Sequence, residues 1–139
     1  MNNIKRATIG TTKGTKTGKQ VVGKLGEDIA CTFLVKHGFS VVERNFRQKC
    51  GEIDIIAQKR GVIYFIEVKS IVIRETRGYR PEENIHFKKI ERFKKAVQLY
   101  LLKRNISHET PFCIHGVSIF LNNSTKKASV RMVENINIG

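Results

Sequence analysis

Two short apolar runs, each rich in β-branched residues, constrain the fold of this chain more than any other feature. They are Ile53–Ala57 and Val62–Ile66, and the residues between them (QKRG, 58–61) are polar and end in glycine, as suits a hairpin turn. Apolar runs with so little alternation are typical of strands covered on both faces, where charged groups are unfavourable. We therefore predict a buried β-hairpin at the centre of the fold.

Three charged residues interrupt or follow these runs. Asp54 lies inside the first run, and Glu67 and Lys69 close the second at alternate positions, which places them on one face of a strand. A hairpin brings Asp54 within reach of both. Hard divalent cations such as Mg²⁺ bind carboxylate and carbonyl oxygens and often share their coordination with a substrate phosphate. The three residues therefore predict a metal site.

The same residues predict hydrolysis of a phosphodiester by a metal-activated water. Lys69 is no metal ligand while it is charged, but beside a metal it can orient or deprotonate the attacking water. A structural alternative stays open. Glu67 and Lys69 can form an ion pair at a strand end, Asp54 can accept hydrogen bonds from backbone amides, and the bare pattern Asp-x12-Glu-x-Lys also arises by chance.

The charge balance favours a polyanionic partner. Lysine and arginine number 26 against 12 acidic residues, which gives a formal net charge of +14. Nucleic acid is the first candidate for such a chain and an anionic membrane the second. Mere solubility is the weaker explanation for so one-sided an excess.

Cysteine usage and hydropathy bear on the compartment. Cys31, Cys50 and Cys113 are scattered and form no C-x-x-C pair, which suits reduced thiols and argues against a zinc site or a disulfide framework. No apolar run approaches the ~18 residues of a transmembrane helix, and the polar N-terminus does not resemble a signal peptide. We expect a cytoplasmic protein with no membrane partner.

The chain divides into a tail and one domain. Residues 1–21 are rich in Thr, Lys and Gly and carry only positive charge, which predicts a flexible basic tail. Such a tail either adds phosphate contacts or is simply a solvated start to the chain. Residues 22–139 are long enough to form a single domain with a real core.

Two helices and five strands are predicted in this domain. The helices cover about 22–36 and 86–104, and the strands cover 40–46, the two hairpin runs, 112–121 and 128–134. The order α-β-β-β-α-β-β indicates an α/β or α+β fold with a sheet flanked by helices. Glu27 lies near the start of the first helix on a partly buried face. It either interacts with the helix dipole or contributes to the metal site.

Basic residues outside the hairpin are candidates for nucleic-acid contacts. Segment 74–84 is a Gly/Pro-containing loop with three arginines and one tyrosine, and one face of the second helix is basic with a single acid in the segment. Such features hold phosphates, although an ordinary exposed loop and a surface helix also show them. The candidates are Arg44, Arg74, Arg77, Arg80, Lys88, Arg92 and Lys95.

Several segments taken together resemble the YraN-like family of bacterial proteins over about residues 22–121. They are Gly23-x-x-Gly26-Glu27-x-x-Ala30, Arg44-Asn45, the runs GEIDIIA (51–57) and FIEVK (65–69), Pro81, and Lys88/Lys89-Ile90 leading to Ala96 and Tyr100-Leu101. That family is similar to the PD-(D/E)XK nucleases, and especially to archaeal Holliday-junction resolvases. The resemblance implies a restriction-endonuclease-like fold with a mixed central sheet flanked by helices.

The resemblance also implies roles for individual residues. Glu27 matches the helix glutamate, Asp54 the metal aspartate, Glu67 the second acid and Lys69 the lysine, and the backbone carbonyl of Val68 is implied to face the metal. The metal would be Mg²⁺ or Mn²⁺. The family often carries an aspartate on a late strand, where this chain has His115. That difference concerns local packing rather than the metal ligands.

We therefore predict that the protein is a metal-dependent endonuclease that acts on DNA, with branched or structured DNA as one candidate substrate. One alternative is a non-catalytic nucleic-acid-binding protein that keeps a nuclease-like fold. Another is an RNA-processing nuclease, which differs only in substrate. A resolvase would need two active sites, so a homodimer is a candidate assembly.

Overall fold

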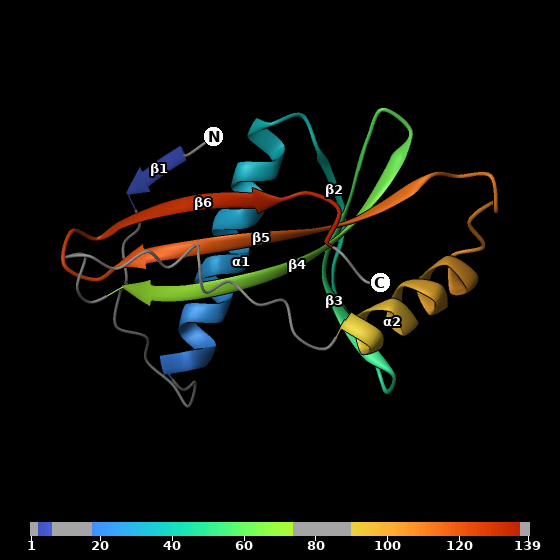
Figure 1. Cartoon of the computed structure of the whole chain (residues 1–139), viewed down its shortest axis with the longest axis horizontal. Helices are drawn as coiled ribbons and strands as arrows, with labels where there is room; N and C mark the ends of the chain where they lie inside the picture. The colour runs from blue at the N-terminus through green and yellow to red at the C-terminus, as the bar shows by residue number, and fades with distance from the viewer. Residues whose placement is uncertain (1–2, 7–17, 74–89, 137–139) are drawn as a thin grey trace.

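The computed structural model describes residues 3–6, 18–73 and 90–136. The elements run in the order β1 (Asn3–Arg6), α1 (Gly18–Lys36), β2 (Ser40–Gln48), β3 (Gly51–Lys59), β4 (Val62–Ile73), α2 (Ile90–Lys103), β5 (Phe112–Asn122) and β6 (Lys127–Val133). The strands form one mixed sheet in the order β1-β6-β5-β4-β3-β2, as Figure 1 shows. This confirms the predicted α/β fold and the predicted order of elements from α1 onward.

One pair of neighbouring strands is parallel. β4 and β5 are paired from Ile63↔Phe112 to Ile73↔Asn122, and the other neighbours are antiparallel. Parallel neighbours need a crossover connection, and α2 lies in the one between β4 and β5. Within the described part of the chain, neither helix is long and apolar enough to cross a membrane.

The two helices cover opposite faces of the sheet. Under α1, Phe33 and Leu34 pack with Ile66 of β4 and other buried residues. Under α2, Phe93 packs in a second cluster with Phe65 of β4. Because side chains alternate along a strand, consecutive residues of β4 enter different cores. The central hairpin is therefore buried on both faces, as its sequence predicted.

The sheet divides between β3 and β4. Their ladder runs from Lys59↔Val62 only as far as Ile55↔Ile66. Beyond that pair, β3 continues with β2 and β4 continues with β5. Figure 1 shows β3 descending toward α2 while β4 runs across the molecule. We call this divergence the fork, and Asp54 is the first residue of β3 beyond it.

Gly26 brings α1 against β4 near the fork. Gly26 is buried, and a Cβ built at this position would overlap Ser70 Oγ and lie 3.0 Å from Ser70 Cβ. Glycine inside a helix is unfavourable by roughly 0.5–1 kcal/mol relative to alanine, so it needs such a reason. The close packing fixes the height of α1 above the strand and thereby places Glu27, the next residue.

Gly26→Ala is expected to destabilise the protein by about 1–3 kcal/mol, because the added methyl group forces helix and strand apart. Ser70→Gly removes the obstructing atoms and should recover part of that loss in the double variant. Urea denaturation of the four proteins in this cycle measures the coupling. Independent, additive effects of the two substitutions would contradict the packing described.

The structure adds two pieces to the segment in which no element was predicted. β1 pairs with β6 from Asn3↔Val130 to Arg6↔Lys127, and α1 begins at Gly18 rather than near Val22. Sheet pairing is made by backbone groups, so an edge strand can form without the apolar pattern on which the prediction relied. Residues 7–17 of the predicted flexible tail lie outside the described residues.

Candidate functional site

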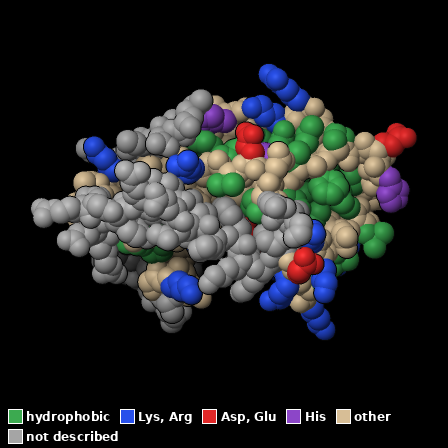
Figure 2. Space-filling view, in the orientation of Figure 1, with side chains coloured by type: hydrophobic (Ala, Val, Ile, Leu, Met, Phe, Trp, Pro, Cys, Tyr) green, Lys and Arg blue, Asp and Glu red, His purple; other side chains and the backbone are tan. Residues whose placement is uncertain are grey.

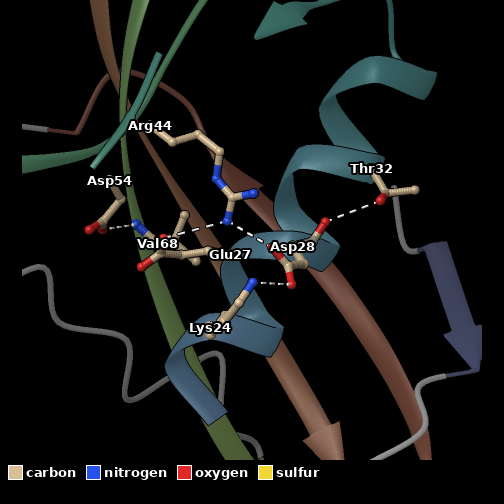
Figure 3. A network of polar contacts seen from close by, with 7 residues as sticks. All are labelled: Lys24, Glu27, Asp28, Thr32, Arg44, Asp54 and Val68. Carbon is tan, nitrogen blue, oxygen red and sulfur yellow. Dashed lines mark hydrogen bonds and ion pairs between the residues drawn. The ribbon is translucent and has the colours of Figure 1, made fainter. Parts of the chain in front are cut away.

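Asp54 is held at the fork by a backbone hydrogen bond. The amide N–H of Val68 in β4 donates to Asp54 Oδ2 over 2.8 Å, so the side chain bridges the two diverging strands (Figure 3). The hydrogen bond from a backbone amide that was considered for Asp54 is therefore present. Within the described residues its other oxygen, Oδ1, makes no hydrogen bond and is available to a ligand.

The surroundings of Asp54 resist its ionisation. Burial raises the pKa of this carboxyl from 3.8 to about 6, although the hydrogen bond from Val68 opposes the shift. The neighbouring carboxylates of Glu27 and Glu52 raise the pKa further, and Arg47 lowers it. Like charges that raise each other's pKa create a place where a cation is stabilised. The shift also shows that Glu27 and Asp54 are close enough to interact.

Glu27 reaches this site from α1. Figure 3 shows its side chain extending from the helix toward Val68, on the side where Asp54 lies. Burial raises the pKa of Glu27, while Arg44, Arg47 and a hydrogen bond from Asn45 lower it. The structure thus brings together Glu27 and Asp54, which are widely separated in the sequence.

Arg44 is tied to acidic residues of α1. Its Nη2 lies 2.8 Å from Asp28 Oδ1 and 3.7 Å from Glu27 Oε1, and Lys24 Nζ lies 3.1 Å from Asp28 Oδ2. Arg44 therefore links β2 to α1 and partly neutralises Glu27. Sequence reasoning placed Arg44 among the nucleic-acid contacts and missed this ion pair. The adjacent acids Glu27 and Asp28 were the only sequence signal that pointed to an ion-pair partner on α1.

Glu67 and Lys69 occupy the other face of β4. Val68 packs against the core under α1, so alternation directs the two flanking side chains toward α2. Glu67 lines a pocket of about 190 Å³ together with Glu52, Arg92 and others. Among the residues that the structure describes, no three or more His, Cys, Asp or Glu are grouped closely enough to hold a metal ion.

The oxygen atoms near the fork fit a cation that takes few protein ligands. Mg²⁺ keeps several waters and commonly binds one or two carboxylates plus substrate phosphate oxygens. Asp54 and Glu27 provide such carboxylates. The Val68 carbonyl provides a further oxygen at the same strand edge, because the N–H and C=O of one strand residue point to the same side.

The other predicted nucleic-acid contacts divide into two groups. Arg92 donates to the backbone carbonyls of Lys49 and Cys50, each over 3.4 Å, and so connects α2 to the β2–β3 turn. Lys95 is exposed on α2. The remaining four candidates lie outside the described residues: Arg74, Arg77, Arg80 and Lys88.

His115 is used in packing. It is buried on β5, its Nδ1 accepts the backbone N–H of Asn135 over 3.1 Å, and its ring meets that of Tyr64 edge-on at 5.0 Å. The histidine therefore connects the C-terminal segment to the sheet. Its role is structural, as expected from the difference at this position.

Fold and site together define an α/β domain in which a mixed sheet is flanked by two helices and acidic residues lie where the sheet divides. The model of the Uncharacterised protein family UPF0102 matches residues 26–119, which include Glu27, Asp54, Glu67 and Lys69. The chain belongs to this family, and the resemblance to YraN-like proteins is confirmed.

Relatives from several bacteria match most of the chain. A UPF0102 protein of Clostridium botulinum is 37% identical over 117 residues, covering 82% of this chain and 91% of the relative. One from a Nitratiruptor species is 40% identical over 118 residues, covering 85% and 94%. One from Campylobacter jejuni is 46% identical over 87 residues, covering 63% and 74%.

Proposed function

We propose that the protein is a metal-dependent endonuclease that hydrolyses phosphodiester bonds in DNA. The observation that carries the proposal is the Asp54 carboxylate, half-buried at the fork and held by the Val68 amide beside Glu27. A carboxyl with a strongly raised pKa next to a second acid is destabilising for the fold, and such groups gather at functional sites. The net charge of +14 supports a polyanionic substrate.

Each residue has a distinct role in this proposal. Asp54 and Glu27 hold Mg²⁺ or Mn²⁺ together with the Val68 carbonyl. Glu67 and Lys69 flank Val68 and complete the site from the other face of β4, Glu67 as a further acid on the metal and Lys69 as the group that orients the attacking water. The bound ion supplies a Lewis acid for the phosphate and lowers the pKa of a coordinated water.

Figure 2 shows a surface that suits this substrate. On the face in view, Lys and Arg side chains (blue) outnumber Asp and Glu (red), and a group of them gathers near the start of α2. Phosphate contacts supply most of the non-specific affinity for nucleic acid, so such a face favours binding before any base is read.

Lys69→Ala is expected to remove most of the cleavage while leaving metal binding intact, because lysine acts on water and is not a ligand. The assay offers linear DNA, branched DNA and RNA with Mg²⁺ or Mn²⁺. The matched control is Lys103→Ala, which removes a lysine at the end of α2 that donates a hydrogen bond to Gln48 of β2. Cleavage that survives Lys69→Ala, or that the control removes equally, contradicts the role given to Lys69.

One observation favours a second candidate, a non-catalytic nucleic-acid-binding protein. The described residues contain no group of three His, Cys, Asp or Glu that could hold a metal ion. This candidate predicts affinity that falls steeply with salt and no cleavage with any metal. The RNA arm of the same assay distinguishes an RNA-processing nuclease. Light scattering with and without branched DNA tests the homodimer that a resolvase would require.

A further inference from the structure

A pocket opens beside Glu27, between the first turns of α1 and the end of β2. It has a volume of about 660 Å³ and is lined by Gln20, Gly23, Lys24, Glu27, Arg44, Asn45 and Arg47. The volume lies in the range of ligand sites. Glu27 forms part of the wall, so the pocket borders the candidate metal site at this residue.

The pocket is predominantly basic. Lys24, Arg44 and Arg47 contribute three positive charges against the single carboxylate of Glu27. Lys24 and Arg44 share Asp28, whereas Arg47 lies 3.7 Å from Glu52 with both side chains more than 60% exposed. Exposed pairs of this kind contribute little energy. Arg47 is therefore free to exchange its partner for an anionic ligand.

Gly23 gives the pocket wall a bare helix backbone. It lies one turn before Glu27 on the same face of α1, and a Cβ built there would meet no atom of the described residues within 4 Å. This differs from Gly26, where close packing on Ser70 accounts for the glycine. Glycine lowers helix stability, and no contact among residues 18–73 and 90–136 explains Gly23. A glycine at this position leaves room for a ligand to approach the backbone closely.

We infer that this pocket binds a phosphate of the nucleic-acid strand, next to the phosphodiester presented to Asp54. Arg47 and Lys24 provide the charge, the bare turn at Gly23 admits the strand, and the amides of Gln20 and Asn45 can hydrogen bond to phosphate or sugar oxygens. The inference deepens the proposed function, because it assigns the substrate a path along α1 into the carboxylate site.

Gly23→Ala provides a test in which stability and binding change in opposite directions. Its melting temperature should rise by a few degrees, because alanine favours the helix and the methyl group has room. Its affinity for a short fluorescein-labelled DNA oligonucleotide, measured by anisotropy without divalent metal, should fall about tenfold. An unchanged affinity in a folded, stabilised variant would overturn the inference.

Arg47→Ala removes one positive charge from the pocket, and its effect is compared with the loss of one positive charge elsewhere on the surface. Loss of one phosphate contact should lower the slope of log affinity against log salt by about one. Arg131→Ala removes the same charge from an exposed position on β6, outside the pocket, and should leave the slope close to that of the wild type. Equal slopes for the two variants would contradict the inference.

The binding assay separates this inference from the proposed function, because it contains no metal and requires no cleavage. If the wild type never cleaves but Gly23→Ala and Arg47→Ala still weaken DNA binding, the pocket is retained and the nuclease assignment fails. If cleavage occurs but neither variant alters binding, the nuclease assignment is retained and the pocket fails.

Discussion

Asp54→Asn is expected to abolish metal-dependent cleavage, lowering its rate by roughly a thousandfold or more, which corresponds to about 4 kcal/mol of transition-state stabilisation. The amide oxygen of the new side chain can still accept the Val68 N–H, so the fork should keep its geometry. The substitution removes the negative charge that would hold the metal. Single-turnover cleavage of the best substrate in the assay measures the effect.

Asp28→Asn is the matched control for this prediction. It makes the same chemical change one residue after Glu27, on a carboxylate that pairs with Lys24 and Arg44. We expect it to reduce cleavage far less, because Asp28 orients Arg44 and does not hold the metal. Comparable losses in the two variants would indicate that the charge network, rather than the Asp54 carboxylate, determines activity.

The free energy of unfolding should decrease as the pH rises from about 4 to 6. The pKa of Asp54 is about 6 in the folded protein against 3.8 ordinarily, so within this window the folded state binds more protons than the unfolded state. Stability therefore falls with rising pH, by about 3 kcal/mol from this one group. The raised pKa of Glu27 acts in the same direction, and the lowered pKa of Asp28 acts in the opposite one.

Denaturant unfolding of the wild type and Asp54→Asn across this pH range isolates the contribution of Asp54. The variant should be the more stable protein at pH 7. Its advantage should shrink as the pH falls from 6 to 4 and disappear near pH 3, where Asp54 is mostly protonated in both states of the wild type. A difference between the two proteins that does not vary with pH would show that the Asp54 carboxyl titrates normally in the folded state.

The central hairpin could be predicted because its constraints are local. The runs around Ile55 and Ile66 have too few polar positions for anything but strands buried on both faces, and the turn between them has the composition of a hairpin. Glu27 could be assigned to the site only through the family resemblance, since spacing alone was equally compatible with a helix-dipole interaction.

The fork and the ion pairs could not be predicted, because they depend on contacts between distant segments. A regular hairpin would pair Asp54 with Glu67, but the ladder ends one pair earlier and Asp54 bonds to the Val68 amide instead. The sequence does not predict an ion-pair partner for Arg44. Asp28 becomes its partner only because α1 packs beside β2. The two glycines of α1 likewise look equivalent until Ser70 is placed against one of them.

The proposed function depends most directly on whether Asp54 binds a divalent metal, and calorimetric titration with Mn²⁺ measures this binding without substrate. We expect the wild type and Asp28→Asn to bind Mn²⁺, and Asp54→Asn to lose that binding, at a pH where the protein is folded. Equal Mn²⁺ binding by Asp54→Asn and the wild type, or no binding by the wild type above pH 6, would contradict it.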